Sequence, residues 1–317
     1  MKVELLTHTP DPLHLMYAQT RGTTTSQGFA TVFEAPARFF PKAARAERDQ
    51  LVAAYDDAQA MEGLSAAHDA IDALDRREMI RVVMDAIEAG HLSVTRSSHF
   101  TFSFTVSRST GRQMLRSVVG VSWEEMSQRY VKLLNWEYAE ALDGLIEESV
   151  NKPSSGALVC EHLARVFEVP EHIQSGKPMD IRRWARVRLE EITAYLGEID
   201  RGAKAEDARE NLPNCTLTQM IGTFSFEALK HFLAKRLCTR AQAPIRGVAK
   251  EMRKLVLSVI PWAAPALAIQ CIPSGICPES RPDGCALLLE NGGRILRKKH
   301  AKDVLDAYVR QQKGSRE

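Results

Sequence analysis

Three arginines and a serine within one short stretch of the chain could bind an anion. The stretch, residues 112–133, holds Arg112, Arg116 and Arg129 and comes soon after a run with strand-like alternation. Guanidinium groups and backbone N–H groups on one segment suit phosphates, because both donate hydrogen bonds to phosphate oxygens. Residues 116–129 show neither helical nor strand periodicity, so we expect a loop there after a short helix. The residues alone also fit a solvated basic loop.

A second cationic region lies at the end of a predicted amphipathic helix, residues 224–238. Arg236 ends the apolar stripe of this helix and is expected to be half-buried. Such an arginine needs an anion, a polar heterocycle or an aromatic face, unless its stem packs and its head reaches water. His231 has a structural alternative too, because it stands four residues after Glu227 on the same helix face.

Several common catalytic motifs are missing from the sequence. It contains no G-x-G-x-x-G after a strand, no G-x-x-x-x-G-K-[ST], no H-E-x-x-H and no G-x-S-x-G. A Rossmann site, a P-loop, acyl transfer and metal-dependent hydrolysis are therefore poorly supported. None of the six cysteines forms a C-x-x-C pair, and although the last three could form half a zinc site or one disulfide, we expect unbridged thiols. The cysteines are Cys160, Cys215, Cys238, Cys271, Cys277 and Cys285.

The composition indicates a globular protein. The 317 residues suffice for one large domain or two modest ones, with 44% hydrophobic and 26% charged residues. The 42 basic and 40 acidic residues give a net charge of +2, which argues against bulk nucleic-acid binding. The N-terminus has no signal-peptide pattern, and no apolar run approaches the roughly 20 residues of a membrane helix. We expect a cytoplasmic protein without membrane contact.

Periodicity predicts the main elements. Residues 3–6 read as a strand, 18–26 as a hydroxyl-rich loop, and 43–90 as helical, with Gly90 ending the helix. Residues 100–106 alternate Phe, Thr, Phe, Ser, Phe, Thr and Val, which predicts an antiparallel sheet with one covered face. Further predicted elements are a linker-like break at 153–156, helical stretches at 160–167, 180–199 and 205–211, and a β-hairpin over 286–296.

Taken together, these pieces resemble the flavin-dependent thymidylate synthase family. The family signature is R-H-R, seven or eight residues, then Ser, usually continuing as S-Q-R-Y. Here it stands as Arg116-Ser117-Val118, eight residues and Ser127-Gln128-Arg129-Tyr130. Upstream the resemblance extends through Gln113 and the Phe-Thr-Phe strand to Gly90-His91. Downstream it covers Ala208-Arg209, the helix containing His231 and the run from Arg236 to Gln242, and Cys271, Gly275 and 277–279 resemble the C-terminal segment of some members.

The sequence also departs from the family pattern. Ser117 and Val118 replace the family's histidine and second arginine, and Glu227 stands where the family usually has an arginine. A titratable donor and a fixed charge beside the flavin are thereby lost. The chain also resembles the polyoxin-type uridylate C5-methylases of nucleoside-antibiotic pathways, which favours a specialised relative with a shifted substrate.

The resemblance implies an α/β (α+β) fold of the thymidylate-synthase-complementing type. It would be one domain over 1–317, with a mixed or antiparallel sheet flanked by helices, helical elaborations at about 43–88 and 157–205, and a C-terminal hairpin and helix at 286–312. The implied assembly is a homotetramer whose active sites are shared between subunits.

The implied activity is a flavin-dependent methyltransferase that converts a uridine 5′-monophosphate, UMP or dUMP or both, to the 5-methyl product. FAD is the implied cofactor, with methylenetetrahydrofolate as carbon donor and NADPH as reductant. Two alternatives remain: an orthodox dUMP-specific thymidylate synthase, and a catalytically silent flavin- or nucleotide-binding protein.

The resemblance also assigns roles to single residues. Arg236 would be catalytic, stabilising charge on the pyrimidine, and no residue is expected to bind a metal. The implied substrate-binding residues are Gln113, Arg116, Glu125, Ser127, Gln128, Arg129, Arg209 and Arg236. The implied cofactor-binding residues are Thr23, His91, Ser93, Arg116, Ser117, Val118, Glu125, Ser225 and His231.

Overall fold

The computed structural model describes residues 1–57, 61–280 and 283–297. Within this part of the chain, the main sheet has four strands in the order β1-β2-β4-β3. Backbone hydrogen bonds show that β2 and β4 are antiparallel, because Arg108 donates to Thr216 beyond one end of the pair and Phe226 donates to Ser98 beyond the other, at 2.9 and 2.8 Å. The predicted antiparallel sheet is confirmed. The strands are β1 (Lys2–His8), β2 (His99–Ser107), β3 (Val121–Glu125) and β4 (Leu217–Ser225).

Strand β2 has the two faces that its sequence predicts. Phe100, Phe102, Phe104 and Val106 are at most 1% exposed. The hydroxyl residues between them are only half-buried. Successive side chains of a strand point to opposite faces, so this alternation fixes which face of β2 meets the core.

The chain divides into two compact units. Unit 1 comprises residues 1–4, 102–118 and 122–222, and unit 2 comprises residues 5–101, 119–121 and those from 223 onward. The residues of each main-sheet strand are divided between these two units. That residues 1–317 form one domain stays a prediction.

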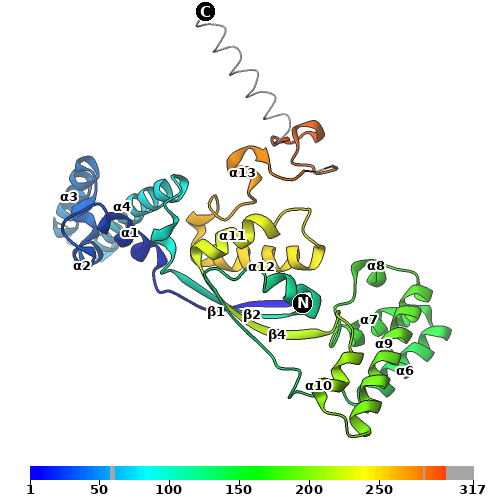
Figure 1. Ribbon diagram of the computed structural model, residues 1–317. Coiled ribbons are helices and arrows are strands. Elements are labelled where there is room, and N and C mark those ends of the chain that lie inside the picture. Colours follow the sequence, from blue (N-terminus) through cyan, green and yellow to red (C-terminus); the bar gives the residue numbers. More distant parts are fainter. Residues whose placement is uncertain (58–60, 281–282, 298–317) are drawn as a thin grey trace, which may run out of the picture. The chain divides into compact units, whose positions relative to one another are not determined.

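Unit 1 is built on α6, α7 and α9, which lie side by side (Figure 1). Their apolar faces form one core that includes Leu142, Ile146 and Ile192, all fully buried. The side chain of Asn135 caps α6 by accepting from the Tyr138 N–H at 2.9 Å. The helices of this unit are α5 (Arg108–Met114), α6 (Trp136–Asn151), η3 (Pro153–Ser155), α7 (Gly156–Leu163), α8 (Glu171–Gln174), α9 (Pro178–Asp200), α10 (Ala205–Ala208) and η4 (Arg209–Asn211).

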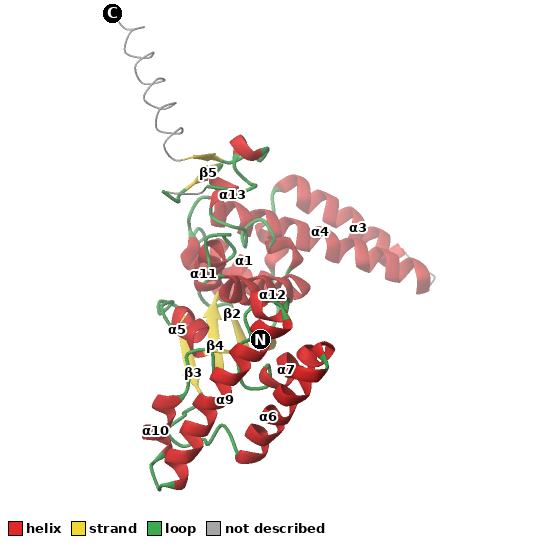
Figure 2. Ribbon diagram, turned by 90° about the vertical axis from the view of Figure 1, so that its right-hand side faces the viewer, coloured by secondary structure: helices red, strands yellow, loops and turns green. Residues whose placement is uncertain are grey.

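Unit 2 contains two helical groups. Helices α3 and α4 lie along one another (Figure 2), and α11 packs on α12. Gly90, with φ +84°, follows α4 as a terminating residue, which confirms its predicted place. The elements are α1 (Pro12–Gly22), α2 (Phe29–Glu34), η1 (Pro36–Phe39), α3 (Lys42–Asp57), α4 (Met61–Glu88), η2 (Leu92–Thr95), α11 (Phe226–Arg236), α12 (Ala243–Val259), η5 (Pro261–Ala263), α13 (Cys271–Ser274), β5 (Ile276–Cys277), η6 (Leu289–Asn291) and β6 (Leu296–Arg297). None of the described helices is long and apolar enough to span a membrane.

The expected loop over residues 116–129 is wrong, because it contains β3. This strand forms through pairing with β4: Met126 donates to Gln219, and Ser225 donates to Gly120, both at 2.9 Å. The partner strand lies some ninety residues further along the chain, so local periodicity could not reveal the pair. Strand β4 itself was not predicted, since its buried face includes Thr218 and Gly222 and its hydropathy does not alternate.

Two further predictions are wrong. Residues 18–22 of the expected hydroxyl-rich loop continue α1. The expected hairpin over 286–296 contains η6 and one isolated parallel bridge, and β6 pairs in parallel with β5. A Cβ on Gly293 would lie 2.0 Å from the Leu287 carbonyl oxygen, so the chain folds back too closely there for a regular two-stranded ladder. The helix expected up to residue 312 falls, from residue 298 on, outside the described residues.

Candidate functional site

A tight turn after β3 carries the serine and arginine of the signature. Tyr130 and Val131 donate backbone hydrogen bonds to the Ser127 carbonyl at 3.3 and 3.2 Å, and the Arg129 N–H donates to Ser127 Oγ at 3.4 Å. Gln128 is 6% exposed, and its buried Nε2 has no hydrogen-bond partner among the described residues. An unpaired buried amide is costly, so this donor fits a site that a polar ligand completes.

Arg129 and Arg209, both predicted to bind the substrate, meet at Glu206. The Arg129 Nε donates to the Glu206 carboxylate at 2.8 Å, and the Arg209 Nε donates to the Glu206 backbone carbonyl at 3.1 Å. Glu206 lies in α10 and Arg209 begins η4, so Glu206 and Arg209 come from two consecutive short helices. The hydrogen bond from Arg129 lowers the pKa of Glu206, which keeps its carboxylate ionised.

Two side-chain bonds fix the edge strand β3. Glu125 accepts from the Thr218 hydroxyl at 3.0 Å, and the Trp123 indole N–H donates to the Ser117 carbonyl at 2.9 Å. Trp123 also packs against Phe104, with ring centroids 5.9 Å apart. The segment that follows α5 is thereby tied to the sheet by its backbone.

The side chains of that segment lie at the surface. Arg116 is exposed, Ser117 is half-buried and Val118 is 68% exposed. Gln113, on the last turn of α5, is half-buried. Unit 1 thus contains the predicted substrate-binding residues from Gln113 to Arg209. Ser117 and Val118, which replace the family's histidine and arginine, are at least partly accessible to solvent in this unit.

Unit 2 holds most of the predicted flavin-binding residues. Thr23 ends α1 and donates its hydroxyl to the Thr20 carbonyl at 2.8 Å. His91 and Ser93 are exposed at the start of η2, which packs against both α1 and α11. His231 is exposed on α11. Three elements far apart in the sequence therefore carry these polar side chains in one unit.

Buried polar atoms near Thr23 lack partners. The Gln19 Nε2 donates to Ser97 Oγ at 2.6 Å, but the Gln19 Oε1 and the Arg21 Nε are buried without a hydrogen bond among the described residues. Hydroxyl, imidazole, amide and guanidinium groups are the donors that the carbonyl edge and phosphates of a flavin dinucleotide accept from. The donor set of unit 2 fits such a group.

Ser225 already has a structural role. Its hydroxyl caps α11 by accepting from the Ala228 N–H at 3.2 Å. Gly120, with φ +72°, approaches it so closely that a Cβ there would lie 2.8 Å from the Ser225 Oγ. Only glycine adopts this conformation without strain and leaves room for the cap. Whether Ser225 also binds cofactor stays a prediction.

The structure pairs Glu227 with Arg96, which the sequence reasoning missed. Two nitrogens of the Arg96 guanidinium donate to the Glu227 carboxylate, the longer contact measuring 3.4 Å. This bond lowers the pKa of Glu227 and joins the segment after η2 to the first turn of α11. The partners are 131 residues apart, so no sequence signal could have linked them. Glu206 was missed as well, although its position three residues before Arg209 places both on one helix face.

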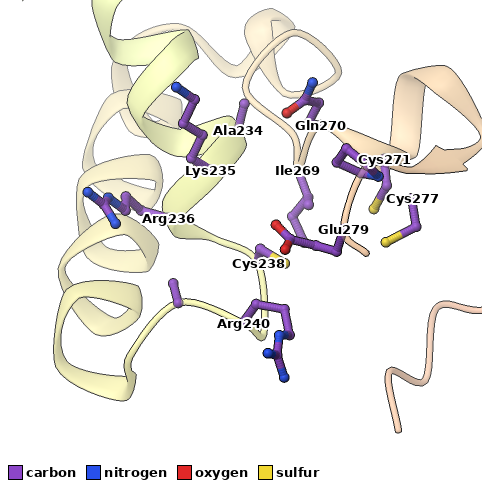
Figure 3. Close-up of a pocket in the computed structure, with 12 residues that line it drawn as sticks. Ala234, Lys235, Arg236, Cys238, Arg240, Ile269, Gln270, Cys271, Cys277 and Glu279 are labelled. Atoms are coloured by element: carbon purple, nitrogen blue, oxygen red, sulfur yellow. The ribbon is translucent and has the colours of Figure 1, made fainter. Parts of the chain in front are cut away.

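Arg236 is half-buried at the end of α11, as predicted. It borders a cavity of about 350 Å³, but Figure 3 shows its side chain directed away from the cysteines on the other side. The cavity therefore does not by itself assign Arg236 a ligand. The lining residues are Ala234, Lys235, Arg236, Cys238, Arg240, Ala241, Ile269, Gln270, Cys271, Cys277, Pro278 and Glu279.

The cysteines are unbridged, which confirms the prediction. Burial raises the pKa of the Cys271 thiol, the neighbouring thiols adding to the shift, and thus keeps it protonated. Among the described residues, no group of three or more His, Cys, Asp or Glu side chains could hold a metal ion. Cys271 and Cys277 are buried in a small apolar cluster with Leu288 and Ile295.

Comparison with known proteins gives a consistent set of relatives. The family model described as "Thymidylate synthase complementing protein" matches residues 4–262, which include every predicted site residue. A flavin-dependent thymidylate synthase of Pyrococcus furiosus is 33% identical over 205 residues, 62% of this chain and 72% of the relative. That of Nitratidesulfovibrio vulgaris is 28% identical over 287 residues, 90% of this chain and 94% of the relative. That of Geobacter sulfurreducens is 31% identical over 191 residues, 60% and 69%.

Proposed function

The chain belongs to the thymidylate synthase complementing protein family, that of the flavin-dependent thymidylate synthases, and from this premise we propose that it methylates C5 of a uridine 5′-monophosphate. It is a methyltransferase that uses FAD, with methylenetetrahydrofolate and NADPH as co-substrates. The observation that carries the proposal is the family match over residues 4–262, because it spans both the arginine turn of unit 1 and the polar groups of unit 2.

The phosphate of the nucleotide would bind at the turn after β3. Arg129 and Arg209 supply charge-assisted hydrogen bonds, and Ser127 and the Gln128 backbone N–H add neutral ones. The contact of both arginines with Glu206 supports this assignment, because it holds two cations beside one another before any ligand arrives. Gln113 and Glu125 would position the nucleotide and the flavin.

The chemical step requires negative charge on the pyrimidine to be stabilised. When bound, the flavin supplies a hydride and methylenetetrahydrofolate supplies the carbon. Arg236 would donate to the N3–O edge of the base and stabilise the charge that develops there. Arg116, with Ser117 and Val118 beside it, and the unit 2 residues Thr23, His91, Ser93, Ser225 and His231 would hold and orient the cofactor. No protein nucleophile takes part in this scheme.

We further propose that UMP is accepted as well as dUMP. Ser117 and Val118 take the place of a larger histidine and a charged arginine, so a site that they border would be less filled. A pocket that rejects a hydroxyl mainly by shape discriminates by about 10²-fold at most, so modest loosening can remove the preference. The resemblance to the polyoxin-type uridylate C5-methylases supports a role in nucleoside-antibiotic synthesis.

Purified chain tests the proposal directly. We expect a yellow protein whose flavin absorbance is bleached by NADPH, and formation of a 5-methyl nucleotide when methylenetetrahydrofolate and a uridylate are added. A catalytically silent relative would bind flavin and nucleotide but transfer no carbon to UMP or dUMP. That result would refute the proposed activity and leave the family assignment intact.

A further inference from the structure

Glu206 stands at the centre of the two arginines that the proposed function assigns to phosphate. Its carboxylate accepts from the Arg129 Nε at 2.8 Å, and its backbone carbonyl accepts from the Arg209 Nε at 3.1 Å. The side chain of Glu206 is 32% exposed and that of Arg129 is 56% exposed. The pair is thus within reach of a dissolved anion.

The carboxylate of Glu206 and a phosphate offer Arg129 the same kind of partner. Both present acceptor oxygens to a guanidinium, so they compete for one cation. Solvent-exposed ion pairs are weak, and exchanging one partner for another costs little. A carboxylate left beside a bound phosphate also repels it, which opposes binding.

An alternative hypothesis is that Glu206 orients Arg129 for the phosphate. In that case, removing the carboxylate would weaken nucleotide binding. The Arg209 contact does not need the carboxylate, since it is made to the backbone carbonyl. One of the two arginines therefore keeps its anchor whatever side chain stands at position 206.

We propose that Glu206 is the resident anion of the phosphate site, which holds Arg129 until the nucleotide phosphate displaces it. The inference rests on the proposed function, in which Arg129 and Arg209 hold the 5′-phosphate. Glu206 acts through Arg129 and is a specificity-determining residue: it lowers the affinity for phosphorylated ligands and leaves that for nucleosides unchanged.

The test is calorimetric titration of the flavin-loaded protein with UMP, uridine and inorganic phosphate. We expect E206Q to bind UMP and phosphate about threefold to tenfold more tightly than the unmodified chain, the range for removing an exposed competing charge. Uridine affinity should change by less than about twofold. Unchanged or weaker UMP binding by E206Q, or an equal gain for uridine, would overturn the inference.

The matched control is E198Q. Glu198 is 41% exposed and pairs with Arg201 at 2.7 Å, so its removal changes the net charge equally without freeing Arg129 or Arg209. If E198Q gains as much UMP affinity as E206Q does, the effect is general electrostatics and the inference is overturned. E206A, which retains the backbone carbonyl, should shift UMP affinity in the same direction as E206Q if the amide variant folds poorly.

The arginine variant separates the two proposals. If R129A binds UMP as well as the unmodified chain does, the proposed phosphate site itself is wrong. If R129A weakens UMP binding but E206Q does not strengthen it, only the inference on Glu206 fails. In the double variant R129A/E206Q we expect the gain from E206Q to disappear, because the freed cation is absent; a gain that persists contradicts displacement.

Discussion

Arg236 has the largest catalytic role that we assign to one side chain. It is half-buried in the last turn of α11. A donor aimed at developing charge contributes far more to turnover than to ground-state binding.

Arg236→Ala should therefore lower turnover by about 10²-fold or more, while flavin content stays near that of the unmodified protein. Steady-state kinetics and the flavin-to-protein absorbance ratio measure the two quantities. Lys235→Ala, at the exposed neighbouring position of α11, is the matched control and should change turnover little. Turnover of Arg236→Ala within a few-fold of the unmodified protein would make Arg236 a packing residue.

The phosphate arginines give a prediction that depends on the ligand. Removing Arg129 or Arg209 should weaken nucleotide binding by about 1.5–3 kcal/mol, the value of a hydrogen bond to a charged group. The loss for the corresponding nucleoside should be much smaller. Arg201→Ala, in the same unit and 66% exposed, controls for loss of a surface charge. Equal losses for nucleotide and nucleoside would rule out the phosphate assignment.

At the scale of elements, the sequence predicted those helices and strands whose signal lies in neighbouring residues. The alternation of β2 and the apolar stripe of α11 depend on neighbouring residues, and both were found. Strand β3 depends on β4, whose buried face carries Thr218 and Gly222, so neither strand showed a hydropathy signal. Helix α12 was not predicted, although its buried residues Ile245, Val248, Ala249, Met252 and Val256 recur at helical spacing.

The candidate site follows the same division. The signature motif predicted Ser127 and Arg129, and the downstream match at Ala208-Arg209 predicted Arg209. It could not predict that Glu206 joins the two arginines, or that Arg96 neutralises Glu227, because such pairs form only when separate segments fold together. The spacing of a motif along the chain does not predict ion pairs between segments that meet only in the folded protein.

The entry to β3 gives a prediction on stability. Gly120→Ala would force a side chain into the left-handed region and place its Cβ 2.8 Å from the Ser225 hydroxyl that caps α11. We expect the free energy of unfolding to fall by about 1–3 kcal/mol from backbone strain, plus a further loss from the disturbed cap. Equilibrium urea unfolding measures the change.

Gly90→Ala is the matched control for that variant. Gly90 also has a positive φ, but an added Cβ there meets no atom within 4 Å. Gly90→Ala should therefore lower the free energy of unfolding through backbone strain alone, and by less than Gly120→Ala does. A loss in Gly120→Ala no larger than that in Gly90→Ala would show that the contact with the Ser225 cap has no energetic weight.

At the scale of the whole molecule, the predicted site residues are distributed over both compact units. Unit 1 holds the phosphate arginines, and unit 2 holds Arg236 and most of the predicted flavin residues. Flavin-dependent thymidylate synthases, as the resemblance implies, complete each site with residues from several subunits.

We accordingly expect a homotetramer in solution. Sedimentation equilibrium should give about four times the 35.4 kDa chain mass, and dilution to the monomer should abolish turnover before it unfolds the chain. A monomer with full activity at all concentrations would show that one chain holds a complete site.

The most direct test of the central claim compares UMP and dUMP as substrates in one assay with methylenetetrahydrofolate, FAD and NADPH. We predict that both are converted to 5-methyl nucleotides, with kcat/KM for UMP within about tenfold of that for dUMP, because Ser117 and Val118 would leave the proposed site less filled. A preference for dUMP above about a hundredfold would make the chain an orthodox thymidylate synthase with an unusual motif. No methylation of either nucleotide by the flavin-loaded protein would contradict the proposed activity altogether.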